Sequence, residues 1–162
     1  MVKIDLLKNH PDAVPVLAKL WYEQEAVRIL HPKMTLEEAQ TRFIPTQDDT
    51  FPILFAAFAD DKPVGMCGLR AETIIRPDLT PWAFGLIVDS DYHQHGIANT
   101  LLAATLLAAK KLDYKKIYGL TINPIVPDWV CRHGWQQIGT EQYHDTPIIV
   151  LEIDLATMQH MD

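Results

Sequence analysis

The sequence predicts an α/β fold built on a mixed β-sheet, and two patterns support this class. Residues 52–59 and 63–71 are apolar, strand-like segments that flank a tight polar loop, a pattern typical of an antiparallel hairpin. Further along, the strand-like segments 82–88 and 116–122 enclose the aliphatic stretch 96–112, whose length suits a helix. Two strands joined by a helix are typically parallel, with a right-handed crossover. A sheet that contains both kinds of pairing is mixed.

The N-terminal part of the chain predicts one strand and two helices. Residues 2–7 alternate between apolar and polar side chains, as a half-buried strand does. Residues 13–30 carry apolar side chains at roughly helical spacing. Thr35 and Glu38 have the spacing of a capping box, so a second helix is expected from there to about Phe43.

The C-terminal part predicts a short helix and a second hairpin. Pro127 suits the first turn of that helix, and Gly134 suits its end. Residues 135–141 and 148–155 are expected to be antiparallel strands around the polar loop 142–147.

Length, charge and cysteine content limit the classes of function. With 162 residues, 48% of them hydrophobic, the chain suits a single domain spanning residues 1–162. Its net charge of −7 argues against a nucleic-acid partner. No segment resembles a signal peptide or a membrane span, so a cytoplasmic location without membrane association is expected. Cys67 and Cys131 form no disulfide framework and no histidine or cysteine spacing fits zinc, so reduced thiols and no metal are expected.

The most informative local feature is the turn between the strand 82–88 and the helix that follows it. A short polar stretch leads from the strand to Gly96, where the helix begins. Backbone N–H groups of such a turn and of a helix's first turn converge on one point, where the helix dipole also favours negative charge. The segment 86–99 is therefore predicted to bind a phosphate or pyrophosphate group.

Two motifs carry a resemblance to a known family. The stretch His93-Gln94-His95-Gly96-Ile97-Ala98 places Gly and Ala as in the signature Arg or Gln, two residues, Gly, one residue, Gly or Ala. Asn123 stands eleven residues before the pair Gly134-Trp135, the spacing of a later Asn and Gly-aromatic motif. With these motifs the chain resembles, over nearly its whole length, the GNAT superfamily of general N-acetyltransferases. Thr80-Pro81-Trp82 and residues 151–155 are similar to segments of small bacterial members.

The resemblance implies a mostly antiparallel central sheet with one parallel, splayed strand pair and helices on both faces. It also implies acetyl-coenzyme A as co-substrate. The backbone of the strand 82–88 would bind the pantetheine arm, and the turn and helix N-terminus would bind the pyrophosphate. The residues that it assigns to the coenzyme are Leu86, Ile87, Val88, His93, Gln94, His95, Gly96, Ile97, Ala98, Asn99 and Asn123.

Two residues depart from the family pattern. His93 stands where Arg or Gln is usual, and a histidine changes charge near neutral pH, so coenzyme binding is expected to strengthen as pH falls. Val130 aligns with a tyrosine that protonates the leaving thiolate in many members. Tyr118 and Tyr143 are candidate replacements for that general acid, with water as another source of the proton. Glu72 is either a base for an ammonium acceptor, directly or through water, or a solvated carboxylate at a strand end.

Aromatic and polar side chains of the first helix are candidates for the acceptor pocket. They are Trp21, Glu25 and His31, joined by Trp82 from the central strand. Trp21 and its neighbour Tyr22 also suit packing in the core or at its rim, which is the commoner use of such an aromatic pair.

The sequence therefore predicts an acetyl-coenzyme A-dependent N-acetyltransferase in which a neutral primary amine attacks the thioester directly, without a covalent enzyme intermediate. The alternative is a non-catalytic acyl-coenzyme A sensor or interaction module on the same fold, which the loss of the usual tyrosine would suit. The acceptor, a small molecule or a peptide, and the acyl-chain length stay open. A homodimer is compatible with the resemblance.

Overall fold

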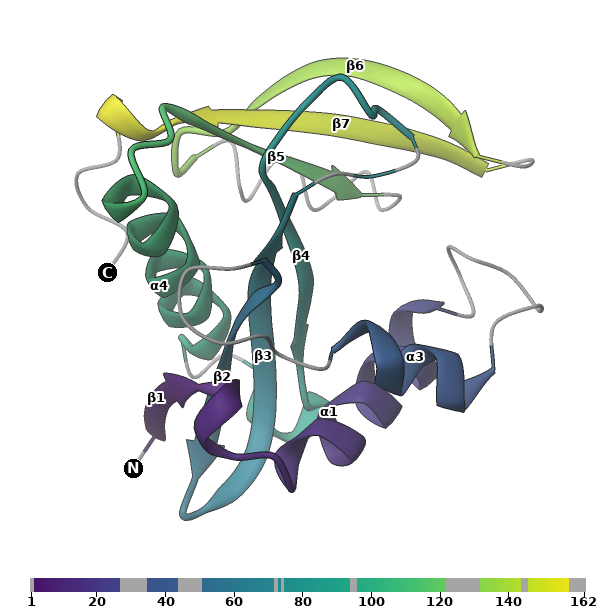
Figure 1. Cartoon of the computed structure of the whole chain (residues 1–162), viewed down its shortest axis with the longest axis vertical. Helices are drawn as coiled ribbons and strands as arrows, with labels where there is room; N and C mark the ends of the chain where they lie inside the picture. The colour runs from purple at the N-terminus through teal and green to yellow at the C-terminus, as the bar shows by residue number, and fades with distance from the viewer. Residues whose placement is uncertain are drawn as a thin grey trace.

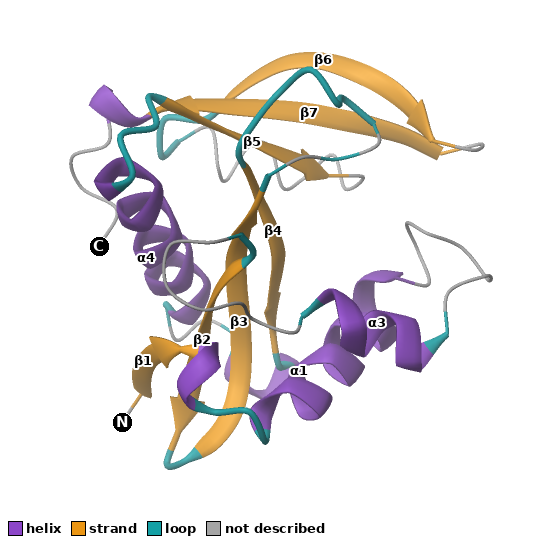
Figure 2. Ribbon diagram, viewed as in Figure 1, coloured by secondary structure: helices purple, strands orange, loops and turns teal. Residues whose placement is uncertain are grey.

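The computed structural model describes residues 2–26, 35–43, 51–71, 73, 75–93, 96–121, 132–143 and 146–157. These residues form a seven-stranded sheet in the order β1-β2-β3-β4-β5-β7-β6, with helices on both faces (Figure 1). The strands are β1 (Val2–Leu6), β2 (Ile53–Ala59), β3 (Lys62–Arg70), β4 (Trp82–Val88), β5 (Lys116–Thr121), β6 (Gln136–Tyr143) and β7 (Thr146–Asp154). The main helices are α1 (Ala13–Trp21), α3 (Leu36–Arg42) and α4 (Ile97–Lys111), and Figure 2 distinguishes them from the strands.

The first half of the sheet confirms the predicted hairpin. Strands β1 to β4 are each antiparallel to the next, and β2 and β3 are joined at Asp60 and Asp61. Both aspartates have positive φ, 49° and 71°, as both central residues of a type I′ turn do. This turn has the twist of the strands it connects, which explains why a loop without glycine forms a tight hairpin here.

The second half of the sheet has an order that local patterns did not predict. The C-terminal hairpin forms as expected, and its strands extend further into the loop than predicted, to Tyr143 and from Thr146. Strand β7 lies between β5 and β6 and pairs antiparallel with both. The chain therefore passes over the position next to β5 before it returns to fill it.

The N-terminal helices agree with the prediction in part. Helix α1 ends at Trp21 and continues as a π-helical turn, Tyr22–Ala26, and residues 27–30 of the predicted helix lie outside the described residues. Thr35 caps α3 as predicted, because its Oγ1 accepts a hydrogen bond from Glu38 N at 3.1 Å. The Glu38 carboxylate accepts from the Thr35 hydroxyl at 3.3 Å rather than from the cap's backbone N–H.

Two apolar cores lie on opposite faces of the sheet. On one face, α4 contributes the buried Leu101, Leu102 and Leu106, which pack with Ile117 of β5 and residues of β7. On the other face, α1 and α3 cover β2, β3 and β4 around Leu17. Since both faces are covered, β3 is buried along most of its length and reads as a continuous apolar run. None of the described helices is long and apolar enough to cross a membrane.

Candidate functional site

A wedge opens between the two parallel strands β4 and β5. Trp82 and Tyr118 are their one register pair among the described residues, and Tyr118 N donates to Pro81 O at 3.1 Å. Beyond this contact the strands diverge (Figure 1). Toward β3, in contrast, β4 stays paired as far as Val88. The edge of β4 that faces β5 therefore offers backbone N–H and C=O groups to an added, strand-like ligand.

A β-bulge at Gly85 shapes the β4 side of this wedge. The register between β3 and β4 shifts between Met66 and Gly68, opposite Gly85, whose φ is +68°. The bulge changes the alternation of side chains, because Phe84 packs with the α1/α3 core whereas Leu86 packs with the α4 core. A Cβ at Gly85 would lie 2.7 Å from Cε1 of Phe43, so the close approach of that ring also requires glycine.

The turn after β4 is held by its own polar contacts. Asp89 N donates to Val64 O at 2.7 Å, and the Asp89 carboxylate accepts from Asp91 N at 3.0 Å. The His93 ring reaches back to the end of β4, where its Nε2 lies 2.9 Å from Val88 O. Because a carbonyl only accepts, Nε2 must carry a proton in this contact. The other ring nitrogen, Nδ1, gains a proton to donate only when the imidazole is charged.

Helix α4 starts at this turn. Its N-cap residue, Gly96, is exposed with φ +73°, and apart from its chain neighbours no atom of the described residues lies within 4 Å of the position its Cβ would occupy. In the first turn of the helix, Ile97 is buried and Ala98 is half-buried. Asn99 is half-buried too, and its buried Oδ1 has no hydrogen-bond partner among the residues that the structure describes. Open space before the N-terminus and an unsatisfied acceptor beside it fit a polar ligand such as the coenzyme.

Several predicted coenzyme residues thus come together in the structure, and others lie outside it. Leu86, Ile87 and Val88 line the end of β4, directly before the turn that carries His93 and Gly96. Gln94, His95, Asn123 and Val130 lie outside the described residues.

The two tyrosines predicted as acids share one face of the sheet. Tyr118 is paired with Glu152 of β7, and Tyr143 with Thr146, and both pairs face away from α4 because Ile117 and Leu151 pack against that helix. The positions opposite the two tyrosines are separated by about 20 Å of extended strand. One thioester cannot be served by both. Glu72, the predicted base, lies outside the described residues.

Tyr118 lies at the closed end of the wedge. Its ring is tilted against Trp82 with centroids 5.6 Å apart. Burial raises the pKa of the Tyr118 phenol, and the facing Glu152 raises it further. The phenol is therefore protonated at neutral pH and can donate a proton.

The predicted acceptor residues are placed less favourably. Trp82 is 1% exposed, and its Nε1 donates to Leu79 O at 2.8 Å. Trp21 is 7% exposed and packs edge-on against Phe43 at 4.9 Å. Both rings are packed in this structure. Packing was the alternative to an acceptor pocket that the sequence left open for Trp21. The side chain of Glu25 and the whole of His31 lie outside the described residues.

Sequence reasoning missed a half-exposed pair on the same face. The guanidinium of Arg70 lies 5.4 Å from the ring centroid of Phe84, a cation–π arrangement, and Phe84 stacks on Phe43. Period-2 alternation could have located Phe84, since it lies two residues after Trp82. The position of Arg70 opposite Trp82 depends on the β3–β4 register, which the sequence did not predict.

Comparison with known proteins agrees with this geometry. A sequence model of the acetyltransferase (GNAT) family matches residues 18–124, more than half of the chain. The chain therefore belongs to the acetyltransferase (GNAT) family, whose members are N-acetyltransferases. No curated protein sequence matches it significantly.

Solved structures share the fold at low sequence identity. An aminoglycoside 6'-acetyltransferase type Ii is 18% identical, with a TM-score of 0.72 over 94% of this chain and 97% of that one. An aminoglycoside 6'-N-acetyltransferase complexed with coenzyme A is 15% identical, with a TM-score of 0.70 over 96% and 97% of the two chains. The ribosomal-protein-S18-alanine N-acetyltransferase from Escherichia coli is 14% identical, with a TM-score of 0.68 over 96% and 94%. The predicted GNAT fold is thus confirmed.

Proposed function

We propose that this protein transfers an acetyl group from acetyl-coenzyme A to a primary amine by direct attack on the thioester. The observation that carries the proposal is the wedge: β4 and β5 separate after one register pair, and the gap opens toward the N-terminus of α4. An extended pantetheine arm suits the unpaired edge of β4, and a pyrophosphate suits the turn and helix N-terminus.

The coenzyme would be held mainly by main-chain groups. Residues of β4 from Leu86 to Val88 would bind the arm, and Gly96, Ile97 and Ala98 the pyrophosphate, since Gly96 leaves open space before its backbone. Asn99 would satisfy its Oδ1 with a donor of the coenzyme. His93 would present Nδ1 to the phosphates. Gln94, His95 and Asn123 complete the set by the family pattern.

In the proposed reaction the amine nitrogen forms a bond to the acetyl carbon, and the carbon–sulfur bond breaks. The chain contributes by holding amine and thioester in attack geometry, which can supply much of the rate. The departing sulfur needs a proton, and we propose Tyr118 as its donor because the phenol is protonated and lies at the wedge. Tyr143, about 20 Å further along the sheet, would then act on the acceptor. Glu72 is proposed as the base that deprotonates the ammonium form.

The acceptor would approach the face of β4 that α1 and α3 flank. Phe84 and Arg70 are half-exposed on that face, and Trp21 and Trp82 would support it from beneath. Names of the structural neighbours specify an aminoglycoside in two cases and a protein alanine in another. We infer further that residues 1–162 form one catalytic domain, because a continuous sheet joins β1 to β6.

Calorimetric titration with acetyl-coenzyme A and with free coenzyme A tests the proposal first. Micromolar binding that weakens in His93→Ala, and weakens with rising pH in the wild type alone, would support the coenzyme site and the role of His93. Turnover is then measured with a polyamine, free lysine, kanamycin and a peptide with N-terminal alanine. Binding without turnover of any amine would favour the non-catalytic sensor. Absence of binding would refute both functions.

A further inference from the structure

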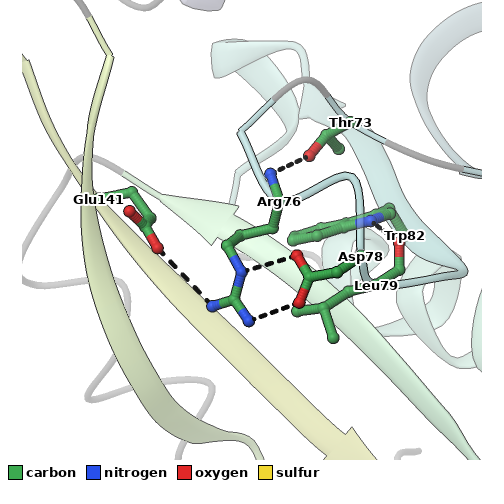
Figure 3. Close-up of polar contacts among 6 residues, drawn as sticks. All are labelled: Thr73, Arg76, Asp78, Leu79, Trp82 and Glu141. Atoms are coloured by element: carbon green, nitrogen blue, oxygen red, sulfur yellow. Dashed lines mark hydrogen bonds and ion pairs between the residues drawn. The ribbon is translucent and has the colours of Figure 1, made fainter.

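Arg76 contacts both Asp78, which precedes β4, and Glu141 of β6 (Figure 3). It belongs to the connection between β3 and β4, where its Nε and Nη2 donate to the two carboxylate oxygens of Asp78 at 3.0 and 2.9 Å. Its third nitrogen, Nη1, lies 3.7 Å from Oε1 of Glu141 on β6. One guanidinium thus links the segment that leads into β4 with the far edge of the sheet.

The connection that carries Arg76 is itself well held. Arg76 N donates to Thr73 Oγ1 at 3.3 Å, and Trp82 Nε1 donates to Leu79 O at 2.8 Å (Figure 3). The two bonds to Asp78 fix the plane of the guanidinium, and this plane directs Nη1 toward β6. A lysine at this position could neutralise charge but could not hold both carboxylates in one fixed geometry.

The bridge acts on the face of the sheet that the proposed function assigns to the acceptor. Glu141 is paired with Ile148, and Tyr143, two residues on, is paired with Thr146. Directly paired residues of antiparallel strands share a face, so Glu141, Tyr143 and Tyr118 all lie on the side away from α4. The proposed coenzyme site lies at the N-terminus of α4, where the wedge opens, whereas Trp82 and Tyr118 mark its closed end.

Stability does not account for such an arrangement. The side chains of Arg76, Asp78 and Glu141 are 28%, 60% and 40% exposed, and ion pairs at this exposure contribute little to folding. The pair does link the β3–β4 connection with the hairpin of β6 and β7, two segments that are far apart in the sequence.

We propose that Arg76 is a positioning residue for the acceptor amine, acting through Glu141 to hold the β6–β7 hairpin at the acceptor side of the wedge. Arg76 touches neither coenzyme nor reacting atoms in this role. The inference rests on the proposed function. Loss of the bridge lets the hairpin move, so the acceptor is bound less tightly while the coenzyme site keeps its geometry.

The test compares Arg76→Gln, Glu141→Gln and the double variant with the wild type. The acceptor is the amine of the panel above with the highest kcat/KM. Each single variant is expected to raise the acceptor KM about two- to fivefold, the range that an exposed ion pair supplies. The double variant is expected to match Arg76→Gln alone, because once Arg76 is replaced its ion pair with Glu141 is already lost. The kcat and the dissociation constant of acetyl-coenzyme A are expected to stay within about twofold.

Two variants and one further measurement separate positioning from a structural role. Arg76→Lys keeps the charge without the fork and is expected to restore the KM in part. Asp5→Asn breaks a surface pair with His10, 2.8 Å long, on the opposite edge strand β1, and is expected to leave all parameters unchanged. Hydrogen exchange of β6 amides at 141–143 is expected to quicken in Arg76→Gln and Glu141→Gln alike.

The outcomes of these measurements distinguish the role of Arg76 from the proposed acetyltransferase function on which it rests. Wild-type protein that acetylates no amine of the panel would overturn the proposed function, and the acceptor role of Arg76 with it. The positioning role alone would be overturned if the wild type acetylates an amine but any of three results is found. These are effects of the two single variants on the acceptor KM that multiply in the double variant, unchanged hydrogen exchange in β6, and an equal loss of affinity for acetyl-coenzyme A. Coupled effects confined to the acceptor KM would support it.

Discussion

Replacement of Gly85 by alanine tests the idea that the bulge in β4 is required by both backbone and packing. The φ of +68° lies in the left-handed region, where a Cβ costs about 1–2 kcal/mol. The new methyl would also lie 2.7 Å from Cε1 of Phe43, a ring that is 0% exposed and contacts both Trp21 and Phe84. Overpacking of this kind costs about 1–3 kcal/mol.

The two costs together predict a loss of about 2–5 kcal/mol, a large part of the 5–15 kcal/mol typical of whole proteins. For a chain of this length the corresponding fall in Tm is on the order of 10 °C. The assay is thermal unfolding followed by circular dichroism, with chemical denaturation as a second measure. Gly139→Ala is the matched control, because its Cβ meets nothing within 4 Å, and its Tm is expected to stay close to that of the wild type.

A second background separates strain from collision. In a Phe43→Leu protein the ring atom nearest Gly85 is gone, so Gly85→Ala is expected to cost only the backbone part, about 1–2 kcal/mol. Equal losses of unfolding free energy in the two backgrounds would show that the contact between the new methyl group and the Phe43 ring costs no stability. A Gly85→Ala protein with the Tm of the wild type would refute both parts of the reasoning.

Three further predictions concern single positions. Gly96→Ala places a methyl in the open space before α4, and calorimetry should show weaker binding of acetyl-coenzyme A, by at least the tenfold that about 1.4 kcal/mol represents; unchanged affinity would move the phosphate site elsewhere. Tyr118→Phe is expected to lower kcat about 10²-fold. The wild type should lose activity only at high pH, where the phenol with its raised pKa deprotonates, and the variant should lack this decline. An unchanged pH profile would exclude Tyr118 as the acid. Burial raises the pKa of Cys67 to about 11, so the folded state holds this proton more tightly than the unfolded one. The protonated thiol contributes its full stabilisation at neutral pH, and this is lost as pH rises toward 11. A pKa shift of about two units corresponds to a loss on the order of 2–3 kcal/mol. In Cys67→Ala the free energy of unfolding, measured against pH, should therefore fall less over this range.

Local structure followed from short stretches of sequence. The strand 82–88 was predicted at its observed bounds because apolar β-formers end abruptly at Asp89. The cap at Thr35 was predictable because it depends on two side chains three residues apart. The end of α1 was harder to predict, because apolar residues continue at helical spacing past Trp21, where the chain changes to a π-helical turn.

The candidate site was predictable in outline only. The turn around Gly96 is a local motif, and its backbone geometry depends on residues within it. The burial of Trp82 was not predictable, since a tryptophan on a central strand faces either an open pocket or a neighbour, and here it packs on Tyr118. The pairing of Arg76 with Glu141 joins residues that no local pattern relates.

By itself the sequence determined the strands, the starts of the described helices, both hairpins and the place of the turn between β4 and α4, because periodicity, capping and turn preferences act between residues a few positions apart. Only the tertiary structure decided that β7 lies between β5 and β6, that a bulge at Gly85 redirects the side chains of β4, and that β4 and β5 part after Trp82 and Tyr118. These features depend on which apolar faces are buried together and on contacts such as Phe43 against Gly85, which arise between segments distant in the chain.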